Sequence, residues 1–404
     1  MAMEFKINKL KAKDLKIVEY GIATGTELDI ICGQDKVLED GSIQKIRGIR
    51  NGTCITLSAI SAFGKTTLAL NIMGYGLRRY KGSQAVIFDA EGGLTNQYIQ
   101  TQLGLSDGQI EEQVTYVPAS EVSTETVREV FDQIVKNKDL KDTFDTGLKD
   151  AHGKPIMGVA PTYILIDSFA ALETRNSMEK DAHNMTFAQN IMQNGRLMTD
   201  IKRYSKSHNI ILLVIAHSGE KINTDMFSSP IKGFQGLKAD INIGGGKTLK
   251  YHSDIMIYGE RYLQGNPEKL EKELGSTGLD YVGKWIIFKS RLSPANSSTY
   301  FGTVKKVQGG FDQVESMKYS MKMTFKNIEH ISMGRYNFSK TIDPEETPNT
   351  EDGERKNFRM SEFNNLIYTD KVFRAKCVAA MEHNYKDIVA PVVSVEEEQM
   401  LDLF

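Results

Sequence analysis

Short apolar runs alternate with longer amphipathic segments between residues 55 and about 307, and this alternation constrains the fold more than any other feature. Runs of this length, bounded by polar residues, are typical of strands that are buried on both faces. They read VIFDAE from Val86, YILIDSFAAL from Tyr163, IILLVIAH from Ile210, SDIMIYGE from Ser253 and KWIIFKS from Lys284. Segments such as 66–80 and 184–207 have the length and composition of helices. The alternation predicts an α/β fold with a mostly parallel, twisted sheet between helices.

The same pattern divides the chain into three parts. We expect residues 1–20 to form a basic amphipathic helix, residues 21–335 to form the α/β core, and residues 336–404 to hold a linker, a small helical region and an acidic tail. Three stretches interrupt the alternation. Residues 136–161 are polar and predict a surface excursion, residues 219–248 form a long, glycine-rich and basic stretch, and residues 340–357 have the composition of a linker.

Composition narrows the class of protein. The 404 residues carry a formal net charge of −2, so any contact with nucleic acid must come from a local basic patch. The chain has three widely spaced cysteines, Cys32, Cys54 and Cys377, which show no disulfide framework or zinc spacing. The longest apolar run, IILLVIA, is too short to cross a bilayer, and the first twenty residues have no signal-peptide core. We therefore expect a soluble cytoplasmic protein with no membrane partner.

The stretch LSAISAFGKTTLALNI, from Leu57, joins an apolar run to a helical pattern through a glycine and a lysine. Its central part, AISAFGKT, fits the phosphate-loop pattern with Ala59 in place of the first glycine. Backbone N–H groups and the positive helix end would cradle phosphates, Lys65 would reach the β- and γ-phosphates of ATP, and Thr66 would hold Mg²⁺. The alanine is tolerable because glycine is needed only where φ is positive or the backbone approaches closely. The alternative is a chance match on an ordinary strand–turn–helix. The predicted ATP-binding residues here are Ala59, Ser61, Ala62, Phe63, Gly64, Lys65, Thr66 and Thr67.

Three more strand ends carry groups that suit a phosphate site. Asp167 ends YILID, where a carboxylate would complete the Mg²⁺ shell; the alternative is an aspartate that caps the next helix. Glu91 follows VIFD, where it would polarise an attacking water; the alternative is a glutamate in a surface turn. His217 ends IILLVIAH, where it could hydrogen-bond a γ-phosphate; the alternative is a histidine satisfied by its neighbours. Carboxyl ends of parallel strands meet at one edge, so these groups are expected to lie together.

These motifs resemble those of RecA-type recombinases over roughly residues 20–315. The matching stretches are TGTELDIICG from Thr24, AISAFGKTT, FDAEGGLTNQYI, IDSFAAL and GGGKTLKYHSD, in this order. The histidine of IAH, DMFS from Asp225 and KSR from Lys289 are similar to the phage UvsX branch of these recombinases. The resemblance implies a RecA-like P-loop ATPase core that uses ATP and Mg²⁺, and a bacterial host cell if the chain is a phage protein.

The resemblance also implies roles for individual residues. Glu91 is similar to the catalytic glutamate, and Tyr98 to the aromatic residue that stacks on adenine, although Tyr98 also fits a core position on a helix. Lys289 and Arg291 match paired basic residues that reach a neighbouring subunit's phosphates; alternatively they are the polar end of an exposed strand. The chain departs from the family at Ala59, at Thr95, where an acidic residue is common, and in the longer segments before Asp167 and after His217.

The glycine-rich basic stretch after His217 predicts a loop that binds single-stranded DNA. Lysines would meet phosphates while aromatic rings or a methionine stack on bases. Its position after His217 would let ATP control DNA affinity; the alternative is a surface loop without a ligand. The candidates are Lys221, Met226, Phe227, Lys232, Phe234, Lys238, Gly244, Gly245, Gly246 and Lys247. A second loop, residues 173–187, adds Arg175 and Lys180 as candidate backbone contacts, although a solvated helix end explains them equally well.

The two ends of the chain predict protein partners. The N-terminal helix matches the region that docks on an adjacent protomer in recombinase filaments; the alternative is a solvated helix. The C-terminal sequence SVEEEQMLDLF joins three glutamates to an apolar peptide. Its acidic part could compete with DNA, and QMLDLF resembles peptides that bind sliding clamps, although a frayed tail also fits. Single-strand-binding and mediator proteins are further expected partners.

The function implied by the resemblance is ATP-dependent DNA strand exchange. The protein would form helical filaments on single-stranded DNA and pair it with a homologous duplex, in recombination, repair and recombination-dependent replication. One alternative is a DnaB-type hexameric replicative helicase motor, whose phosphate loop reads similarly. Another is a non-catalytic, nucleotide-gated DNA-binding mediator or regulator with a degenerate site.

Overall fold

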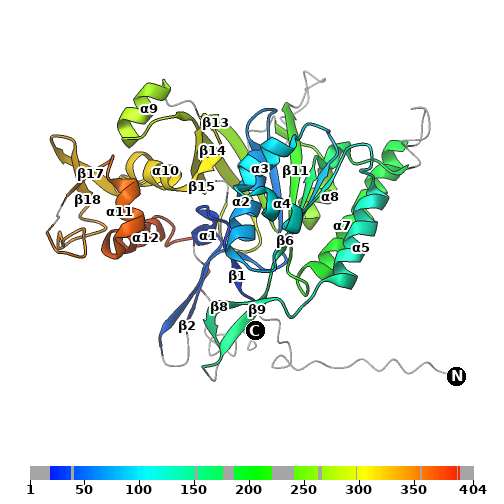
Figure 1. The fold of residues 1–404 in the computed structure, drawn as a ribbon, viewed down its shortest axis with the longest axis horizontal. Coiled ribbons are helices and arrows are strands. Elements are labelled where there is room, and N and C mark those ends of the chain that lie inside the picture. Colours follow the sequence, from blue (N-terminus) through cyan, green and yellow to red (C-terminus); the bar gives the residue numbers. More distant parts are fainter. Residues whose placement is uncertain are drawn as a thin grey trace, which may run out of the picture.

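The structure is a computed structural model that describes residues 19–37, 41–150, 153–175, 186–220, 241–262, 266–296, 298–354, 357–388 and 390–391. One large sheet dominates this part of the chain, and helices cover both of its faces (Figure 1). The expectation of an α/β fold with a mostly parallel sheet is confirmed. Among the described residues, no helix combines the length and apolar composition that crossing a membrane requires.

The sheet has ten strands in the order β16-β15-β14-β13-β5-β11-β10-β6-β7, with β12 paired to β11. Neighbours from β13 to β7 run parallel. These strands are β5 (Cys54–Ala59), β6 (Gln84–Asp89), β7 (Val114–Val117), β10 (Thr162–Asp167), β11 (Ile210–Glu220) and β13 (Ile255–Tyr262). On the other side of β13, the pairings are antiparallel through β14 (Leu279–Ser290), β15 (Tyr300–Lys306) and β16 (Phe311–Asp312).

The apolar runs are continuous because each face of the sheet is buried under different helices. Along β11, Ile211 and Leu213 belong to one core cluster, whereas Ile210 and Leu212 belong to another. Helices α2 (Lys65–Arg79) and α3 (Asn96–Leu103) pack on the first face. Helices α5 (Thr124–Asn137) and α7 (Thr186–Ser205) pack on the second. A strand buried on both faces has no polar alternation, and its sequence reads as an unbroken apolar run.

Small elements surround this core (Figure 1). The polar stretch after α5 forms a two-stranded hairpin, as expected of a surface excursion. The remaining helices are α1 (Leu28–Ile31), α4 (Asp107–Gln113), α8 (Gly246–His252), α9 (Pro267–Leu274), α10 (Gln313–Tyr319), α11 (Phe363–Thr369) and α12 (Lys371–Asn384). The remaining strands are β1 (Gly21–Ile22), β2 (Gln34–Val37), β3 (Ile43–Ile46), β4 (Ile49–Arg50), β8 (Thr143–Lys149), β9 (Pro155–Val159), β12 (Ile241–Ile243), β17 (Ile328–Ser332), β18 (Arg335–Phe338), β19 (Phe358–Arg359) and β20 (Ala390–Pro391).

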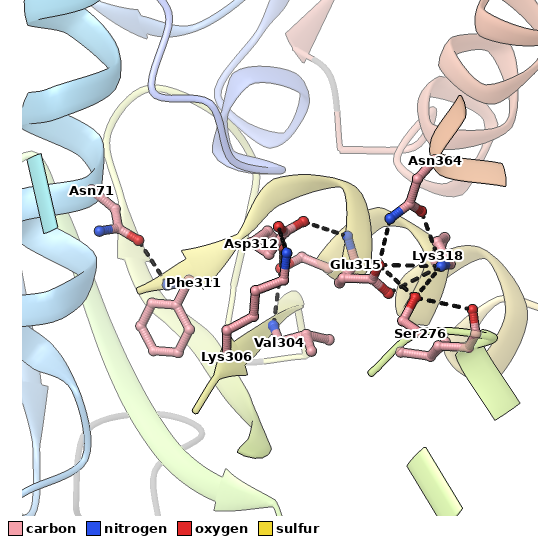
Figure 2. Close-up of polar contacts among 11 residues, drawn as sticks. Asn71, Ser276, Val304, Lys306, Phe311, Asp312, Glu315, Lys318 and Asn364 are labelled. Atoms are coloured by element: carbon pink, nitrogen blue, oxygen red, sulfur yellow. Dashed lines mark hydrogen bonds and ion pairs between the residues drawn. The ribbon is translucent and has the colours of Figure 1, made fainter. Parts of the chain in front are cut away.

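The C-terminal helices are joined to the core by apolar and polar contacts. Phe363 and Phe373 lie in the same core cluster as α2, and a buried network links α10 to α11 through Glu315, Lys318 and Asn364 (Figure 2). The expected boundary at residues 335–336 falls inside β18. Residues of the expected linker are packed rather than free: Asn349 is buried and accepts a hydrogen bond from Lys376 of α12. The expected N-terminal helix, except residues 19–20, and the acidic tail lie outside the described residues.

Candidate functional site

The strand order brings four of the predicted site residues to one edge of the sheet. Strands β5, β11, β10 and β6 are consecutive and parallel, so their carboxyl ends share that edge. His217 pairs in register with Ala59, and Asp167 pairs with Asp89, two residues before Glu91. Ligands of open parallel sheets bind at this edge. These groups therefore lie at one edge as expected, but His217 does not end its strand, because β11 continues to Glu220 to pair with β12.

The loop between β5 and α2, residues 60–64, has the backbone that anion binding requires. Ala62 and Gly64 have φ of 58° and 103°, whereas Ala59 is an ordinary strand residue. This explains why alanine is tolerated at position 59, since the positive φ angles occur later in the loop. Residues 61–62 form a turn, and within the described chain the backbone N–H groups of Gly64, Lys65 and Thr66 donate to no other protein group. These N–H groups and the start of the 15-residue helix α2 therefore offer an anion site.

Lys65 is the first residue of α2, and its ammonium group lies folded over the loop. Its Nζ donates to the carbonyl oxygens of Ala59 and Ile60, at 3.2 and 2.9 Å. Burial lowers the pKa of Lys65, while the nearby carboxylates of Asp167 and Glu91 oppose this effect. The same ammonium could exchange these carbonyls for phosphate oxygens, because both are acceptors and only the phosphate carries the opposite charge.

Thr66 and Asp167 are in direct contact, although they are far apart in sequence. The Thr66 hydroxyl donates to Oδ2 of Asp167 at 2.7 Å. Burial raises the pKa of Asp167 to about 6, and the negative charges of Glu91 and Asp89 act in the same direction. A hydroxyl and a carboxylate oxygen side by side are hard oxygen ligands of the kind that Mg²⁺ takes together with phosphate oxygens. These residues fit the predicted metal.

Glu91 and His217 face each other across the end of β10. Nε2 of His217 lies 2.6 Å from Oε1 of Glu91, and the Glu91 N–H donates to the carbonyl of Asp167 at 3.3 Å. Burial of Glu91 acts to raise the pKa of its carboxyl. The polar groups of Ser168 and His217 and the charge of Lys65 outweigh burial and lower this pKa below its ordinary value. Glu91 is therefore an anionic acceptor near neutral pH.

Asp89 shapes the turn that carries Glu91, a role that we did not infer from the sequence. Its carboxylate accepts hydrogen bonds from the N–H groups of Gly92 and Leu94, at 2.8 and 2.9 Å, and from the hydroxyl of Tyr116, at 2.9 Å. The signal in the sequence is the aspartate before AEGG, since aspartate commonly accepts from backbone N–H groups a few residues ahead. Asp89 fixes the path of the chain at the position from which Glu91 projects.

The predicted DNA-binding stretch begins directly after His217. Strand β12 pairs antiparallel with the end of β11, and the Gly244 N–H donates to the carbonyl of His217 at 2.8 Å. Gly245, with φ of 80°, precedes α8, which begins at Gly246 and includes the exposed Lys247. The candidates Lys221, Met226, Phe227, Lys232, Phe234 and Lys238 lie outside the described residues.

Tyr98 is half-buried on α3, and its hydroxyl lies 2.7 Å from that of Thr67 on α2. Its ring packs against the apolar core cluster. Thr95 is the N-cap of α3 and accepts a hydrogen bond from the Tyr98 N–H at 3.2 Å. The threonine in place of an acidic residue therefore has a local structural role as a helix cap.

Lys289 and Arg291 lie at the opposite edge of the sheet from the loop. Lys289 pairs with Met256, which pairs with Thr56 near the start of β5. Both cations bind carbonyls at the C-terminal end of α8: Lys289 Nζ lies 2.6 Å from that of Ser253, and Arg291 donates to that of Tyr251 at 2.8 Å. Burial and the charge of Arg291 lower the pKa of Lys289 to about 8.

Arg175, a candidate DNA contact, is paired within the chain. Its guanidinium makes two contacts with the carboxylate of Glu129 on α5, at 2.9 and 2.8 Å. A phosphate would have to compete with this bidentate pair, which no local pattern predicts because 46 residues separate the partners. Lys180 lies outside the described residues.

No family model matches the chain, and no curated protein matches it either.

Proposed function

We propose that this chain is an ATP-dependent DNA recombinase with a RecA-like P-loop core, which forms filaments on single-stranded DNA and promotes strand exchange. The observation that supports this most is the convergence of a free-amide loop, Lys65, the Thr66–Asp167 pair and the Glu91–His217 pair at one sheet edge. Loop amides, a lysine, a metal-binding hydroxyl–carboxylate pair and a second carboxylate are the parts that nucleoside triphosphate hydrolysis needs.

Each residue has a distinct part in the proposed ATPase reaction. Lys65 leaves the loop carbonyls and neutralises phosphate charge, while Thr66 and Asp167 hold the metal. Bound Mg²⁺ would neutralise the charge that develops on the phosphates. Glu91 is anionic, so it can accept a hydrogen bond from the attacking water and orient it. His217 holds the Glu91 carboxylate in the free protein and would be released from it when phosphate enters.

The connection from His217 to β12 suggests how nucleotide controls DNA binding. The His217 side chain contacts Glu91, while its carbonyl oxygen accepts from the N–H of Gly244. A shift of His217 toward a phosphate would therefore move the β11–β12 strand pair, which flanks the basic stretch. This two-state contact gives DNA affinity a dependence on bound ATP.

Lys289 and Arg291 favour a filament over an isolated subunit. The register places Lys289 of β14 level with Thr56, which is three residues before Ala59, or on the order of 10 Å along the strand direction at about 3.3 Å per residue. Strand β13 also lies between β14 and β5. The Lys289 side chain is directed to α8 rather than to the loop of its own chain. We propose that these two cations serve the nucleotide of a second copy, which would tie hydrolysis to assembly.

The decisive experiment measures ATP hydrolysis with and without single-stranded DNA, together with joint-molecule formation between single-stranded and homologous duplex DNA. Lys65→Ala should abolish both activities, whereas Lys81→Ala, an exposed lysine beyond the end of α2, should leave both unchanged. Glu91→Gln should retain ATP-dependent DNA binding and lose hydrolysis.

Each alternative has its own outcome in these assays. Electron microscopy that finds closed hexameric rings on DNA, with duplex unwinding and no joint molecules, would replace the proposal with a helicase motor. Nucleotide binding without DNA-stimulated hydrolysis, unchanged by Glu91→Gln, would favour a non-catalytic mediator. Absence of ATP binding in the wild-type protein would overturn the whole proposal.

A further inference from the structure

Phe63 is the residue of the loop that points into the protein. Its side chain is 1% exposed, although its neighbours Ser61 and Ala62 are exposed. The ring packs edge-on against Trp285 of β14, with centroids 4.8 Å apart and an interplanar angle of 77°. An aromatic pair of this geometry stabilises beyond the apolar area that it buries. The loop is therefore attached to the antiparallel edge of the sheet by a buried side chain.

Gly259 of β13 leaves the space that the Phe63 ring occupies. A Cβ atom at Gly259 of β13 would lie 2.2 Å from Cε1 of Phe63, a distance that no side chain tolerates. Gly259 does not have a positive φ, so its backbone gives no reason for glycine. The close approach of the Phe63 ring gives that reason.

Tyr281 of β14 holds the backbone of the same residue. Its hydroxyl donates to the carbonyl oxygen of Phe63 at 2.8 Å, and both residues are buried. In a planar trans peptide, the carbonyl and the following N–H point in opposite directions. Because the Phe63 carbonyl points toward the Tyr281 hydroxyl, the N–H of Gly64 is directed away from it, and this N–H has no hydrogen-bond acceptor among the described residues.

Phe311 of β16 packs against the two β14 residues that contact Phe63. It packs edge-on against Tyr281 and Trp285, with centroids 6.4 and 6.3 Å away. A Cβ atom at Gly64 would lie 3.0 Å from its ring. Phe311 is itself held at its N–H by Asn71 of α2, at 2.8 Å (Figure 2). Strands β14 and β16 and helix α2 thus surround the loop with rigid contacts.

We infer that Tyr281 is a positioning residue of the nucleotide site: through the Phe63 carbonyl, it directs the Gly64 N–H toward bound phosphate. The inference rests on the proposed ATP-binding function and deepens it. Tyr281 contacts the loop at the Phe63 carbonyl, so its proposed effect on the site passes through the loop. The Tyr281 hydroxyl carries this positioning effect, because a phenylalanine at position 281 would keep the ring contact with Phe311 and lose only the hydrogen bond.

The test is Tyr281→Phe, which keeps the ring and removes the hydrogen bond. We expect the dissociation constant for ADP with Mg²⁺, measured by titration calorimetry, to rise about tenfold, as for the loss of one hydrogen bond. KM for ATP should rise by a similar factor, with kcat changed by less than about twofold. The control is Tyr80→Phe, which removes another buried hydroxyl, the acceptor of the Ala23 N–H at 2.8 Å, at the far end of α2.

The outcomes separate the inference from the function on which it rests. If wild-type protein does not bind ADP with Mg²⁺, the proposed function fails. If wild-type binds, Lys65→Ala does not, and Tyr281→Phe binds as wild-type does, the function stands and the inference is overturned. If Tyr80→Phe weakens binding as much as Tyr281→Phe does, the effect is general loosening of the fold, and the inference is again overturned.

Discussion

The buried ion pair between Lys318 and Glu315 gives the sharpest test of how the C-terminal helices are held to the core. Their side chains are 0% and 1% exposed, and Nζ of Lys318 lies 3.1 Å from Oε2 of Glu315. Oε1 of Glu315 also accepts from Ser276 at 2.6 Å and from Asn364 of α11 at 2.7 Å (Figure 2). The perturbation is Lys318→Met, which keeps an unbranched side chain, shortens it by one atom and removes its charge.

The expected loss in the free energy of unfolding depends on the partners that Glu315 keeps after the substitution. Glu315 keeps two neutral donors on Oε1, but its charge loses the only cation that the described structure places against it at hydrogen-bond distance. Removing one member of a buried pair typically costs about 3–5 kcal/mol, since an uncompensated charge remains in a medium of low dielectric constant. Replacing both residues, as Glu315→Leu with Lys318→Met, removes the charge and leaves only unpaired neutral groups, at a cost of about 1–3 kcal/mol.

The assay is equilibrium unfolding in urea, followed by the fluorescence of Trp285, the one tryptophan of the chain. The control is Lys340→Met, whose side chain is 81% exposed in its pair with Glu346 and whose loss should cost less than about 1 kcal/mol. The reasoning is refuted if Lys318→Met costs as little as the control. It is also refuted if the double variant is less stable than Lys318→Met alone.

Three further predictions concern packing and protonation. Gly259→Ala should lower the unfolding midpoint through its clash with Phe63, whereas Gly108→Ala, in open space within a helix, should be neutral or stabilising by up to about 1 kcal/mol; thermal unfolding measures both. Because Asp167 has a pKa of about 6, protons should compete with Mg²⁺ below that pH, and Mg²⁺-dependent ADP binding, followed by calorimetry from pH 8 to 5, should weaken about tenfold per unit. Burial raises the pKa of Glu27 to about 7, so its charged form opposes folding at higher pH. Glu27→Gln should therefore stabilise the protein by up to about 3 kcal/mol at pH 8, and this gain should vanish toward pH 4.5. A change in the free energy of urea unfolding that does not depend on pH would contradict this.

Much of the fold could be predicted from short-range patterns. The run from Ile210 reads as a buried strand because both faces of β11 are covered, and the helical pattern after Gly64 becomes α2. The site residues at strand ends were predictable for the same reason, since a polar residue that ends an apolar run must lie at a sheet edge. The contact of Thr66 with Asp167 also needs the strand order, because β11 lies between β5 and β10.

The contacts that could not be predicted join residues far apart along the chain. Tyr281 and Phe63 are separated by 218 residues, and neither residue type signals the other. Arg175 is a candidate DNA contact or part of a solvated helix end by sequence, yet it pairs with Glu129 of α5, whose first residue, Thr124, donates its N–H to the carbonyl of Glu173. The stretch after Lys340 has the composition of a linker, but Asp343, Thr347 and Asn349 all accept hydrogen bonds from Lys376 of α12. Side-chain partners of this kind depend on which elements become neighbours.

The sequence by itself determined which apolar runs form buried strands and where a helix starts behind a glycine and a lysine, but not every strand end, because β11 continues three residues past His217 and β10 stops at Asp167. These features depend on local hydrophobic periodicity and backbone preference, which a chain carries before it folds. Only the tertiary structure decided that β11 and β10 lie between β5 and β6, that His217 thereby meets Glu91, and that Tyr281 lies beneath the loop. Lateral strand order arises from the packing of both sheet faces at once, which no local stretch of sequence encodes.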